Sequence, residues 1–390
     1  METSPLRVPL TRESYSSRED CESEPFARKK NNTIGLRILL ICISSFVVQT
    51  ELAQYVQKKK QYHKPYFILW VAHSIWIIVL PLQFAFRPHL REYIQEFLSI
   101  GGELFNTVKP SYHPVHIDFE DADDIPSIIN YLRHDPVVSY LLKISAFYAS
   151  CVCLVGYSWY IAVNLTTTAK LTTIYNTSCF WTYVFSIILL GELVKMVKIG
   201  AVCLSIAGVI IMSFFNDDQK ISQPDDDIAI FYDSIFTSGD LIAFSGAVLY
   251  GLCEVLYKKY VSPPRPSILF SNTITGLIGT FTLLFLWIPI PILHWIGVEE
   301  FELPDLFTFS YIILIALAGV VFNASFMLVI AFTSPIFAAI GIMLTIPLVA
   351  VVDVLVTGNP LGTSVLAGSI CIFLAFLLLS WDKINFQLRN

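Results

Sequence analysis

The sequence predicts an all-α integral membrane protein with ten transmembrane helices in two inverted five-helix repeats. Three observations support this fold class. Of the 390 residues, 55% are hydrophobic and only 14% are charged, whereas a soluble domain usually carries about 25% charged residues. The apolar residues fall in blocks of about 20, the length that a helix needs to cross a bilayer. Finally, segments far apart along the chain resemble each other, which is typical of transporters built from repeats.

The apolar blocks are expected to be helices, because backbone polar groups in lipid must be satisfied within their own segment. The fourth block is the least apolar of the series, since Thr, Asn and Ser residues dilute it. The approximate ranges are 34–56, 66–86, 138–163, 171–190, 195–215, 239–257, 267–289, 309–332, 336–356 and 362–381.

These helices and their connections divide the chain into five parts. The first 33 residues are polar and lack an apolar stretch, so they are predicted to be disordered. The parts are a disordered cytosolic tail (1–33), a first five-helix repeat (34–216) with a polar cytosolic loop at 87–137, an acidic linker loop (217–236), a second five-helix repeat (237–382) and a cytosolic C-terminal tail (383–390).

The distribution of basic residues predicts the orientation of the helices. If the N-terminus is cytosolic, 17 Lys and Arg residues lie in cytosolic segments and 6 in the opposite loops. Positive charge concentrates on the cytosolic side of membrane proteins, so both termini are expected in the cytosol. The cluster Lys58-Lys59-Lys60 is a local exception to this rule.

Two weak similarities indicate the repeat. Glu51 ends the first apolar segment and Glu254, 203 residues later, ends the sixth. Segments four and five match segments nine and ten at an offset of 168, for example Gly200 with Gly368. One long insertion at 87–137 explains the difference between the two offsets. Because each repeat has an odd number of helices, the second must be inverted relative to the first.

Charged residues within the apolar segments are candidates for function, because each costs roughly 2.5 to 3.5 kcal/mol to insert at the centre of the bilayer. All of them lie near segment ends, so snorkelling or an interfacial ion pair is the competing interpretation. Glu51 and Glu254 occupy repeat-related places, which favours function for these two. The full set is Glu51, Lys143, Lys170, Glu254 and Asp353.

The fourth segment carries several polar side chains that cannot all face lipid. They either hold helices together or line a water-filled path. Asn323 in the eighth segment is a weaker case of the same kind. The predicted substrate-binding residues are Glu51, Tyr55, Lys170, Tyr175, Asn176, Tyr250, Glu254 and Asn323. Gly200 and Gly208 are interpreted instead as positions of close helix packing.

Other function classes are not indicated. The acidic excess, a formal net charge of −6, lies in loops, and a basic nucleic-acid footprint is absent from the sequence. Most of the eight cysteines lie in apolar segments without metal-site spacing. Phosphate-binding, zinc-protease and serine-hydrolase motifs are also absent from the sequence. We therefore expect no enzyme activity, no cofactor and no metal.

Several stretches resemble the drug/metabolite transporter (EamA-like) superfamily, including Gly191-Glu192, Gly208-Val209-Ile210 and Gly239-Asp240-Leu241. The similarity is greatest to solute carrier family 35, subfamily F, and its fungal vacuolar and thiamine-related relatives. It rests on three stretches: Glu51-Leu52-Ala53-Gln54-Tyr55, His294 to Pro304, and Leu344-Thr345-Ile346-Pro347. The resemblance implies ten helices in two repeats and an internal membrane, vacuolar or Golgi. The family's nucleotide-sugar carriers use a lysine in helix nine that is missing here, which disfavours that substrate.

The sequence therefore predicts a secondary transporter that moves a small polar metabolite by alternating access between the two repeats. Its expected partners are a small-molecule substrate, cationic or zwitterionic, and the lipid bilayer; a homodimer stays open. The alternative is a non-transporting scaffold or sensor that acts through loop 87–137.

Overall fold

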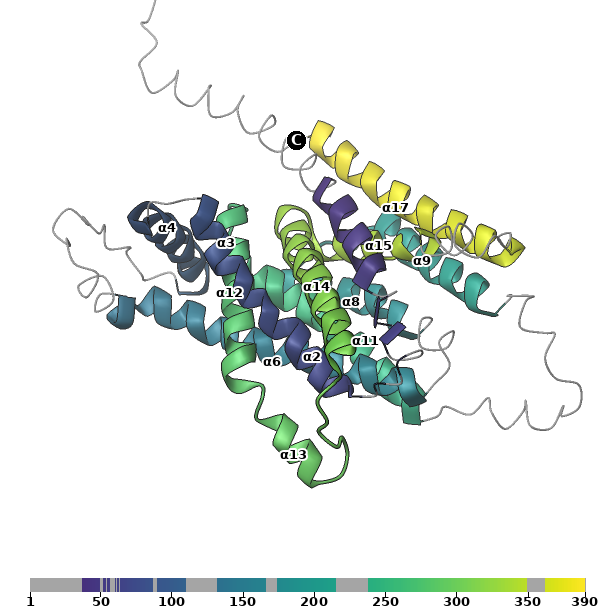
Figure 1. Cartoon of the computed structure of the whole chain (residues 1–390). Coiled ribbons are helices and arrows are strands. Elements are labelled where there is room, and N and C mark those ends of the chain that lie inside the picture. The colour runs from purple at the N-terminus through teal and green to yellow at the C-terminus, as the bar shows by residue number, and fades with distance from the viewer. Residues whose placement is uncertain are drawn as a thin grey trace, which may run out of the picture.

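A computed structural model describes residues 37–49, 52–53, 55–56, 60, 62, 64–86, 90–109, 132–165, 174–214, 238–348 and 362–389. Over these residues all regular secondary structure is helical (Figure 1). The predicted tail 1–33 and the acidic linker 217–236 lie outside the described residues. So do three of the charged residues that are candidates for function, Glu51, Lys170 and Asp353.

The helices occur in the same order as the predicted apolar segments. Six described helices are long and apolar enough to cross a membrane: Pro65–Gln83, Pro136–Ala162, Gly239–Val261, Ile268–Phe285, Leu306–Phe332 and Thr363–Trp381. Four shorter apolar helices complete the series: Arg37–Gln49, Ile174–Leu190, Met196–Ile211 and Pro335–Leu348. The prediction of a helical multi-pass membrane protein is confirmed.

Individual elements have the following bounds. The N-terminal half contains the helix Arg37–Gln49, α2 (Pro65–Ser74), a 3₁₀ turn (Ile75–Ile78), α3 (Val79–Phe86), α4 (Leu90–Val108), α6 (Pro136–Leu165), α8 (Ser178–Leu190) and α9 (Met196–Phe214). The C-terminal half contains α11 (Ser238–Leu256), a π-helical turn (Tyr257–Val261), α12 (Ile268–Phe285), α13 (Pro289–Trp295), α14 (Leu306–Phe332), α15 (Pro335–Ile342) and α17 (Thr363–Arg389).

Local sequence explains several helix ends. Ser267 and Ser334 precede α12 and α15, and each side chain accepts a hydrogen bond from a first-turn N–H group of its helix. Such capping satisfies donors that have no partner within the helix. Pro335 then occupies the first turn of α15, where no N–H is required. The C-terminal end of α8 is set by Gly191, whose φ of 68° is the left-handed conformation that glycine adopts without strain.

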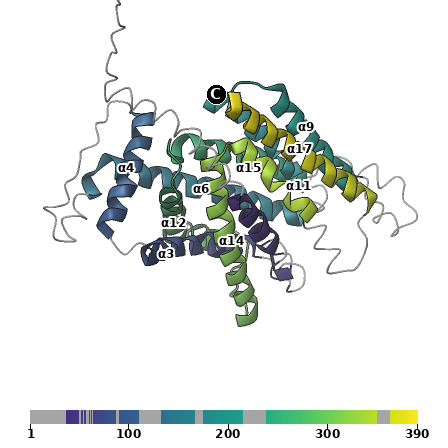
Figure 2. The same cartoon turned by 90° about the horizontal axis from the view of Figure 1, so that it is seen from above.

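The helices pack around α12 and α11. The former contacts α2, α3, α6 and α14, whereas α11 packs against α6 and α8. Helices α9 and α17 form the most extensive helix pair and lie side by side at one end of the molecule, with α4 at the other end (Figures 1 and 2). Both halves of the chain are therefore interleaved rather than packed as separate domains.

Glycine permits the close approach of α9 and α17. A Cβ atom at Gly208 would lie 2.7 Å from the carbonyl oxygen of Gly368. Further along α9, Gly200 faces Leu378, so higher residue numbers in one helix meet lower numbers in the other. The two helices therefore run antiparallel, and the prediction that these glycines serve helix packing is confirmed.

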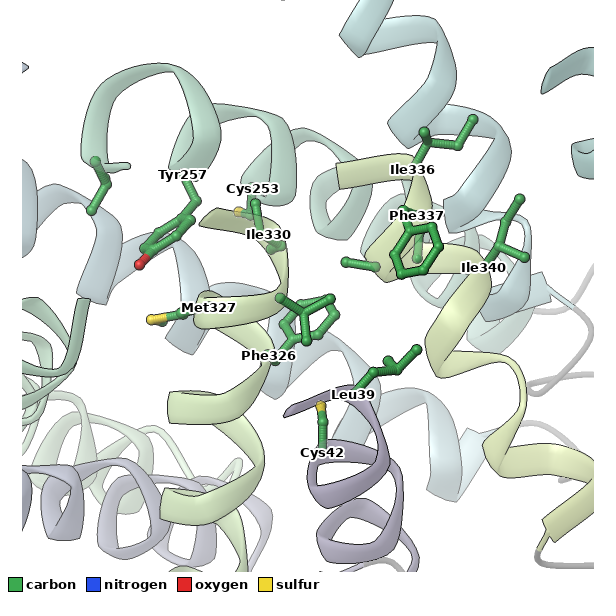
Figure 3. Packing of buried hydrophobic residues seen from close by; sticks show 14 of the residues in the cluster. Leu39, Cys42, Cys253, Tyr257, Phe326, Met327, Ile330, Ile336, Phe337 and Ile340 are labelled. Carbon is green, nitrogen blue, oxygen red and sulfur yellow. The ribbon is translucent and has the colours of Figure 1, made fainter. Parts of the chain in front are cut away.

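The largest buried cluster joins the two halves. Leu39 and Cys42 of the first helix lie in it beside Phe326 and Ile330 of α14 (Figure 3). Residues of α15, among them Phe337, complete the same cluster. Burial of such side chains away from water contributes roughly 1.5 to 3 kcal/mol each to stability. Within a lipid bilayer, close packing between the helices stabilises the contact instead.

The prediction that 87–137 is a loop is wrong for its first part. Residues Leu90–Val108 form α4, which packs against α6 and α12. Phe97 stacks on Phe270 with ring centroids 5.2 Å apart, and a Cβ at Gly101 would lie 2.8 Å from Leu141. The helix was missed because its apolar residues fall on one face only, which lowers its average hydrophobicity. Residues 110–131 lie outside the described part.

Candidate functional site

Glu254 is the most deeply buried of the candidate site residues. It lies at the end of α11 with 1% of its surface exposed. The hydroxyl group of Thr182 in α8 donates a hydrogen bond to its Oε2 atom at 2.8 Å. Its Oε1 atom is buried and has no hydrogen-bond partner among the residues that the structure describes. Because burying an unpartnered polar atom is costly, such an atom calls for an explanation beyond stability.

The competing interpretation of Glu254 is snorkelling or an interfacial ion pair, and Lys258 is the nearest lysine along the chain. The structure places Lys258 elsewhere, because its Nζ atom donates to the carbonyl oxygen of Ala331 at 2.7 Å. Ala331 lies in the last turn of α14, where a cation is favourable next to the negative end of the helix dipole. A residue that is 1% exposed also does not snorkel. Glu254 is therefore buried within the protein and does not pair with Lys258.

Two predicted tyrosines contact each other on the N-terminal side of Glu254. The rings of Tyr175 and Tyr250 have centroids 6.2 Å apart. Tyr250 is one turn before Glu254 on α11, and the hydroxyl group of Tyr175 donates to the carbonyl oxygen of Val155 in α6 at 3.0 Å. Asn176 follows Tyr175 and is half-buried. The structure thus brings together Tyr175, Tyr250 and Glu254 from two helical segments.

An aromatic row extends from Tyr250 into the other half of the chain. The ring of Tyr250 stacks on that of Phe326, with centroids 6.2 Å apart and an interplanar angle of 7°. Phe326 stacks on Phe322 at 5.7 Å, and Phe322 contacts Phe46 of the first helix at 4.8 Å. We name the five rings Tyr175, Tyr250, Phe326, Phe322 and Phe46 the aromatic row. Thr182 and the three phenylalanines were not predicted; the spacing of Phe322 and Phe326 by one helical turn was the available signal.

Two other predicted residues lie away from this group or are engaged locally. The amide of Asn323 donates to the carbonyl oxygen of Gly319 on its own helix at 2.8 Å. The ring of Tyr55 contacts that of Tyr311 in a tilted arrangement, with centroids 4.9 Å apart, next to a second buried cluster that contains Ala53 and Val56. The structure therefore supports a central group around Glu254 and places Tyr55 near one end of the helices.

A small pocket lies beside the N-terminus of α2. Its lining residues are Lys64, Phe67, Ile290, Leu293, Glu299 and Phe301. The Glu299 carboxylate accepts hydrogen bonds from the backbone N–H groups of Tyr66 at 3.0 Å and Phe67 at 3.2 Å. Burial here raises the pKa of the Glu299 carboxyl group, an effect opposed by these two donors and by Lys64. Glu299 thus fastens the loop after α13 onto α2, more than 200 residues away in sequence.

In the part of the chain that the structure describes, no three His, Cys, Asp or Glu side chains form a group that could hold a metal ion. Described cysteines, such as Cys42 and Cys253, are free thiols.

Comparison with known proteins identifies the relatives of the chain. No family model matches it. An uncharacterized transporter of Schizosaccharomyces pombe is 32% identical over 57% of this chain, and the alignment spans 64% of that protein. Solute carrier family 35 member F5 of Bos taurus is 23% identical, covering 99% of this chain and 85% of the relative. An uncharacterized vacuolar membrane protein of Saccharomyces cerevisiae is 24% identical over 90% of this chain and 91% of its own length.

A solved crystal structure has a similar fold. It superposes with a TM-score of 0.52 over 92% of this chain and 99% of that chain, at 12% sequence identity. The likeness concerns the fold alone. Member F5 belongs to the subfamily that the stretches beginning at Glu51 and His294 resemble. The chain is therefore a homologue of solute carrier family 35 member F5 and of fungal vacuolar membrane proteins, consistent with the drug/metabolite transporter superfamily.

Proposed function

We propose that the protein is a secondary transporter that moves a small polar metabolite across an internal membrane by alternating access. In this proposal all ten apolar helices span the bilayer, and they form two inverted repeats of five. The relatives are named as transporters or as a vacuolar membrane protein, which supports this class and an internal membrane.

The pattern of helix contacts supports the inverted repeats. A two-fold relation between the halves exchanges α6 with α14, α2 with α12, α8 with α15 and α9 with α17. Under this exchange the contact of α6 with α12 corresponds to that of α2 with α14, and both are present. In three further contacts, the exchange swaps the two partners with each other. These contacts are also present: α9 with α17, α8 with α15, and α2 with α12. Such agreement between contacts is expected from inverted repeats.

The first helix of each half follows the same relation. Helix α11 contacts α6, and the helix Arg37–Gln49 contacts α14 through Phe46 and Phe322. Likewise α11 contacts α8, and Leu39 of the first helix meets Gly341 of α15. The aromatic row and Glu254 therefore lie where the first helix of each half meets the opposite half.

The observation that carries the function is the buried Oε1 atom of Glu254, which has no hydrogen-bond partner within the described part of the chain. A carboxyl group in the membrane interior is costly and usually lies on a substrate or proton path. Glu254 would bind a cationic group of the substrate or a coupling proton, and the aromatic row would bind the rest of a cationic or zwitterionic molecule through its ring faces. Glu51, Lys170 and Asn176 stay proposed members of the site. Both termini are proposed to be cytosolic.

A thermal-shift screen of small metabolites on the purified protein tests the proposal. Substrates should raise the melting temperature of the wild-type protein, because ligands that bind the native state stabilise it. Glu254→Gln should lose this shift while keeping the melting temperature of the free protein. If none of the metabolites shifts the wild-type protein, or if the shifts are the same in the variant, Glu254 does not form the site. The alternative function, a scaffold acting through loop 87–137, predicts no metabolite shift at all.

A further inference from the structure

Helices α6 and α11, one from each half of the chain, pack against each other in a defined register. At one end of the contact, the ring of Tyr148 in α6 meets that of Tyr257, which directly follows α11, with centroids 5.4 Å apart. At the other end, a Cβ atom at Gly246 of α11 would lie 2.5 Å from the hydroxyl oxygen of Ser158 in α6. Higher residue numbers in one helix meet lower numbers in the other, so the two helices run antiparallel.

Two cysteines lie between these two contacts. Cys151 is three residues after the tyrosine of α6 and seven before the serine. Cys253 is four residues before the tyrosine that follows α11 and seven after the glycine. Residues separated by three, four or seven positions share one face of an α-helix. The register therefore places Cys151 opposite Cys253, on the faces through which α6 and α11 contact each other.

The side chains agree with this register. Both residues are free thiols, and the two thiol groups are hydrogen-bond partners of each other. Cys253 belongs to the largest buried cluster (Figure 3), and Cys151 packs against that cluster. A disulfide requires Cα atoms no more than about 6.8 Å apart, and the close approach of the two backbones at Gly246 favours such a spacing.

The two thiols differ in exposure. Cys253 is only 6% exposed, whereas Cys151 is half-buried. A small oxidant therefore reaches Cys151 first, and Cys253 is the neighbouring thiol that can react with the oxidised product. An accessible thiol next to a second, resolving thiol is the arrangement typical of cysteines that oxidise reversibly.

We propose that Cys151 and Cys253 are an oxidisable dithiol, and that their disulfide fixes α6 to α11 and stops transport. The oxidant is hydrogen peroxide. The Cys151 sulfur attacks one peroxide oxygen, the O–O bond breaks, and a sulfenic acid forms with release of one water molecule. The Cys253 sulfur then attacks the sulfenic sulfur, the S–O bond breaks, and a second water molecule leaves. The pair loses two electrons and two protons, and the peroxide is reduced to water.

The disulfide joins the two halves next to the proposed binding site. Cys253 directly precedes Glu254 and follows Tyr250 of the aromatic row by three residues. The inference rests on the proposed alternating-access function, in which the two halves move relative to each other. The equivalent contact, between Arg37–Gln49 and α14, cannot form such a link because α14 contains no cysteine. Oxidation thus fixes one of the two equivalent contacts and holds the carrier in a single conformation.

Peroxide treatment of vesicles that contain the full-length protein tests the proposal. Remaining thiols are blocked with a maleimide, and the protein is digested without a reductant. Mass spectrometry then measures the peptide pair that is joined through Cys151 and Cys253. We expect this pair to appear, the release of solutes from the vesicles to fall several-fold, and dithiothreitol to reverse both changes.

Three variants provide the controls. Cys151→Ala should give no joined peptides and should keep its solute release in peroxide. Cys253→Ala should behave in the same way, so the result does not depend on the folding of one variant. Cys153→Ser is the matched control, because this buried thiol of the same helix contacts the Nδ1 atom of His73 at 3.3 Å instead. It should respond to peroxide as the wild type does.

Absence of the joined peptides, in a sample in which the exposed thiol of Cys203 is oxidised, overturns the dithiol. Unchanged solute release from fully joined protein overturns the claim that the disulfide stops transport. If reduced wild-type vesicles release no metabolite, the proposed transport function is contradicted instead, and the joined peptides alone decide whether the dithiol forms.

Discussion

Glu254 of α11 and Thr182 of α8 meet in the protein interior, with the threonine hydroxyl group 2.8 Å from the carboxyl oxygen. Glu254→Gln keeps an acceptor for this hydrogen bond and removes the charge. We predict that it abolishes or sharply reduces transport, while expression and melting temperature stay near those of the wild type. Normal transport by the variant would exclude Glu254 as the residue that binds substrate or proton. The same substitution at Glu51 should have the same effect.

Thr182→Val should lower the stability of the protein more than Glu254→Gln does. It removes the only hydrogen-bond donor that the structure gives the Glu254 carboxyl group among the described residues. Leaving a buried polar group without a partner costs about 1 to 3 kcal/mol. We therefore expect a lower melting temperature than for Glu254→Gln, measured on detergent-purified proteins. A variant as stable as the wild type would show that water replaces the threonine.

Helix α4 is predicted to be part of the packed core. Gly101→Val would place side-chain atoms against Leu141 and Val137 of α6, because even a Cβ there lies within 3.1 Å of both. Overpacking of this kind costs about 1 to 3 kcal/mol. Ser99→Val, on the exposed face of the same helix, is the matched control. Equal melting temperatures for the two variants would mean that α4 does not pack as described.

Glu299 should give the protein a pH-dependent stability. Because burial raises the pKa of this carboxyl group in the folded protein, its protonated form is favoured by folding. Its contribution to stability is thus complete below the ordinary carboxyl range and is lost as the pH rises through the raised pKa.

Glu299→Gln removes this dependence, so the melting temperature of the wild type relative to the variant should rise from neutral to acidic pH. Glu300→Gln, at the exposed neighbouring position, should show no such trend. A wild-type advantage that grows with rising pH would reverse the sign of the argument and show that the two N–H donors outweigh burial.

Both termini are predicted to be cytosolic. The prediction rests on the bias of 17 to 6 in loop Lys and Arg residues. Tags placed near residue 2 and after Asn390 should both be cleaved by protease added to sealed vesicles with the cytosolic side outward. Protection of either tag would contradict the proposed orientation.

The sequence predicted the helices well because a lipid environment imposes length and apolarity on each of them. All ten predicted apolar segments contain a described helix. By contrast, α4 is amphipathic, so its helical periodicity is not visible in a search for apolar blocks. The contact between Glu299 and α2 could not be predicted either, because it joins residues more than 200 positions apart.

Within the site, Glu254 could be predicted because a charged residue is costly in an apolar segment. Tyr175 could be predicted because the fourth segment carries several polar residues. The phenylalanines of the aromatic row were missed because Phe322 and Phe326 are indistinguishable from ordinary core residues without knowing which helices they face. The pairing of Tyr55 with Tyr311 depends on helix packing for the same reason.

Solute release from vesicles tests the central claim most directly. Liposomes containing the purified protein are loaded with a mixture of small metabolites, and the solutes that leave are identified by mass spectrometry. We predict that at least one polar metabolite leaves wild-type vesicles much faster than protein-free vesicles, and that Glu254→Gln vesicles retain it. If every metabolite leaves wild-type and protein-free vesicles at the same rate, the protein is not a carrier of these solutes and the account is contradicted.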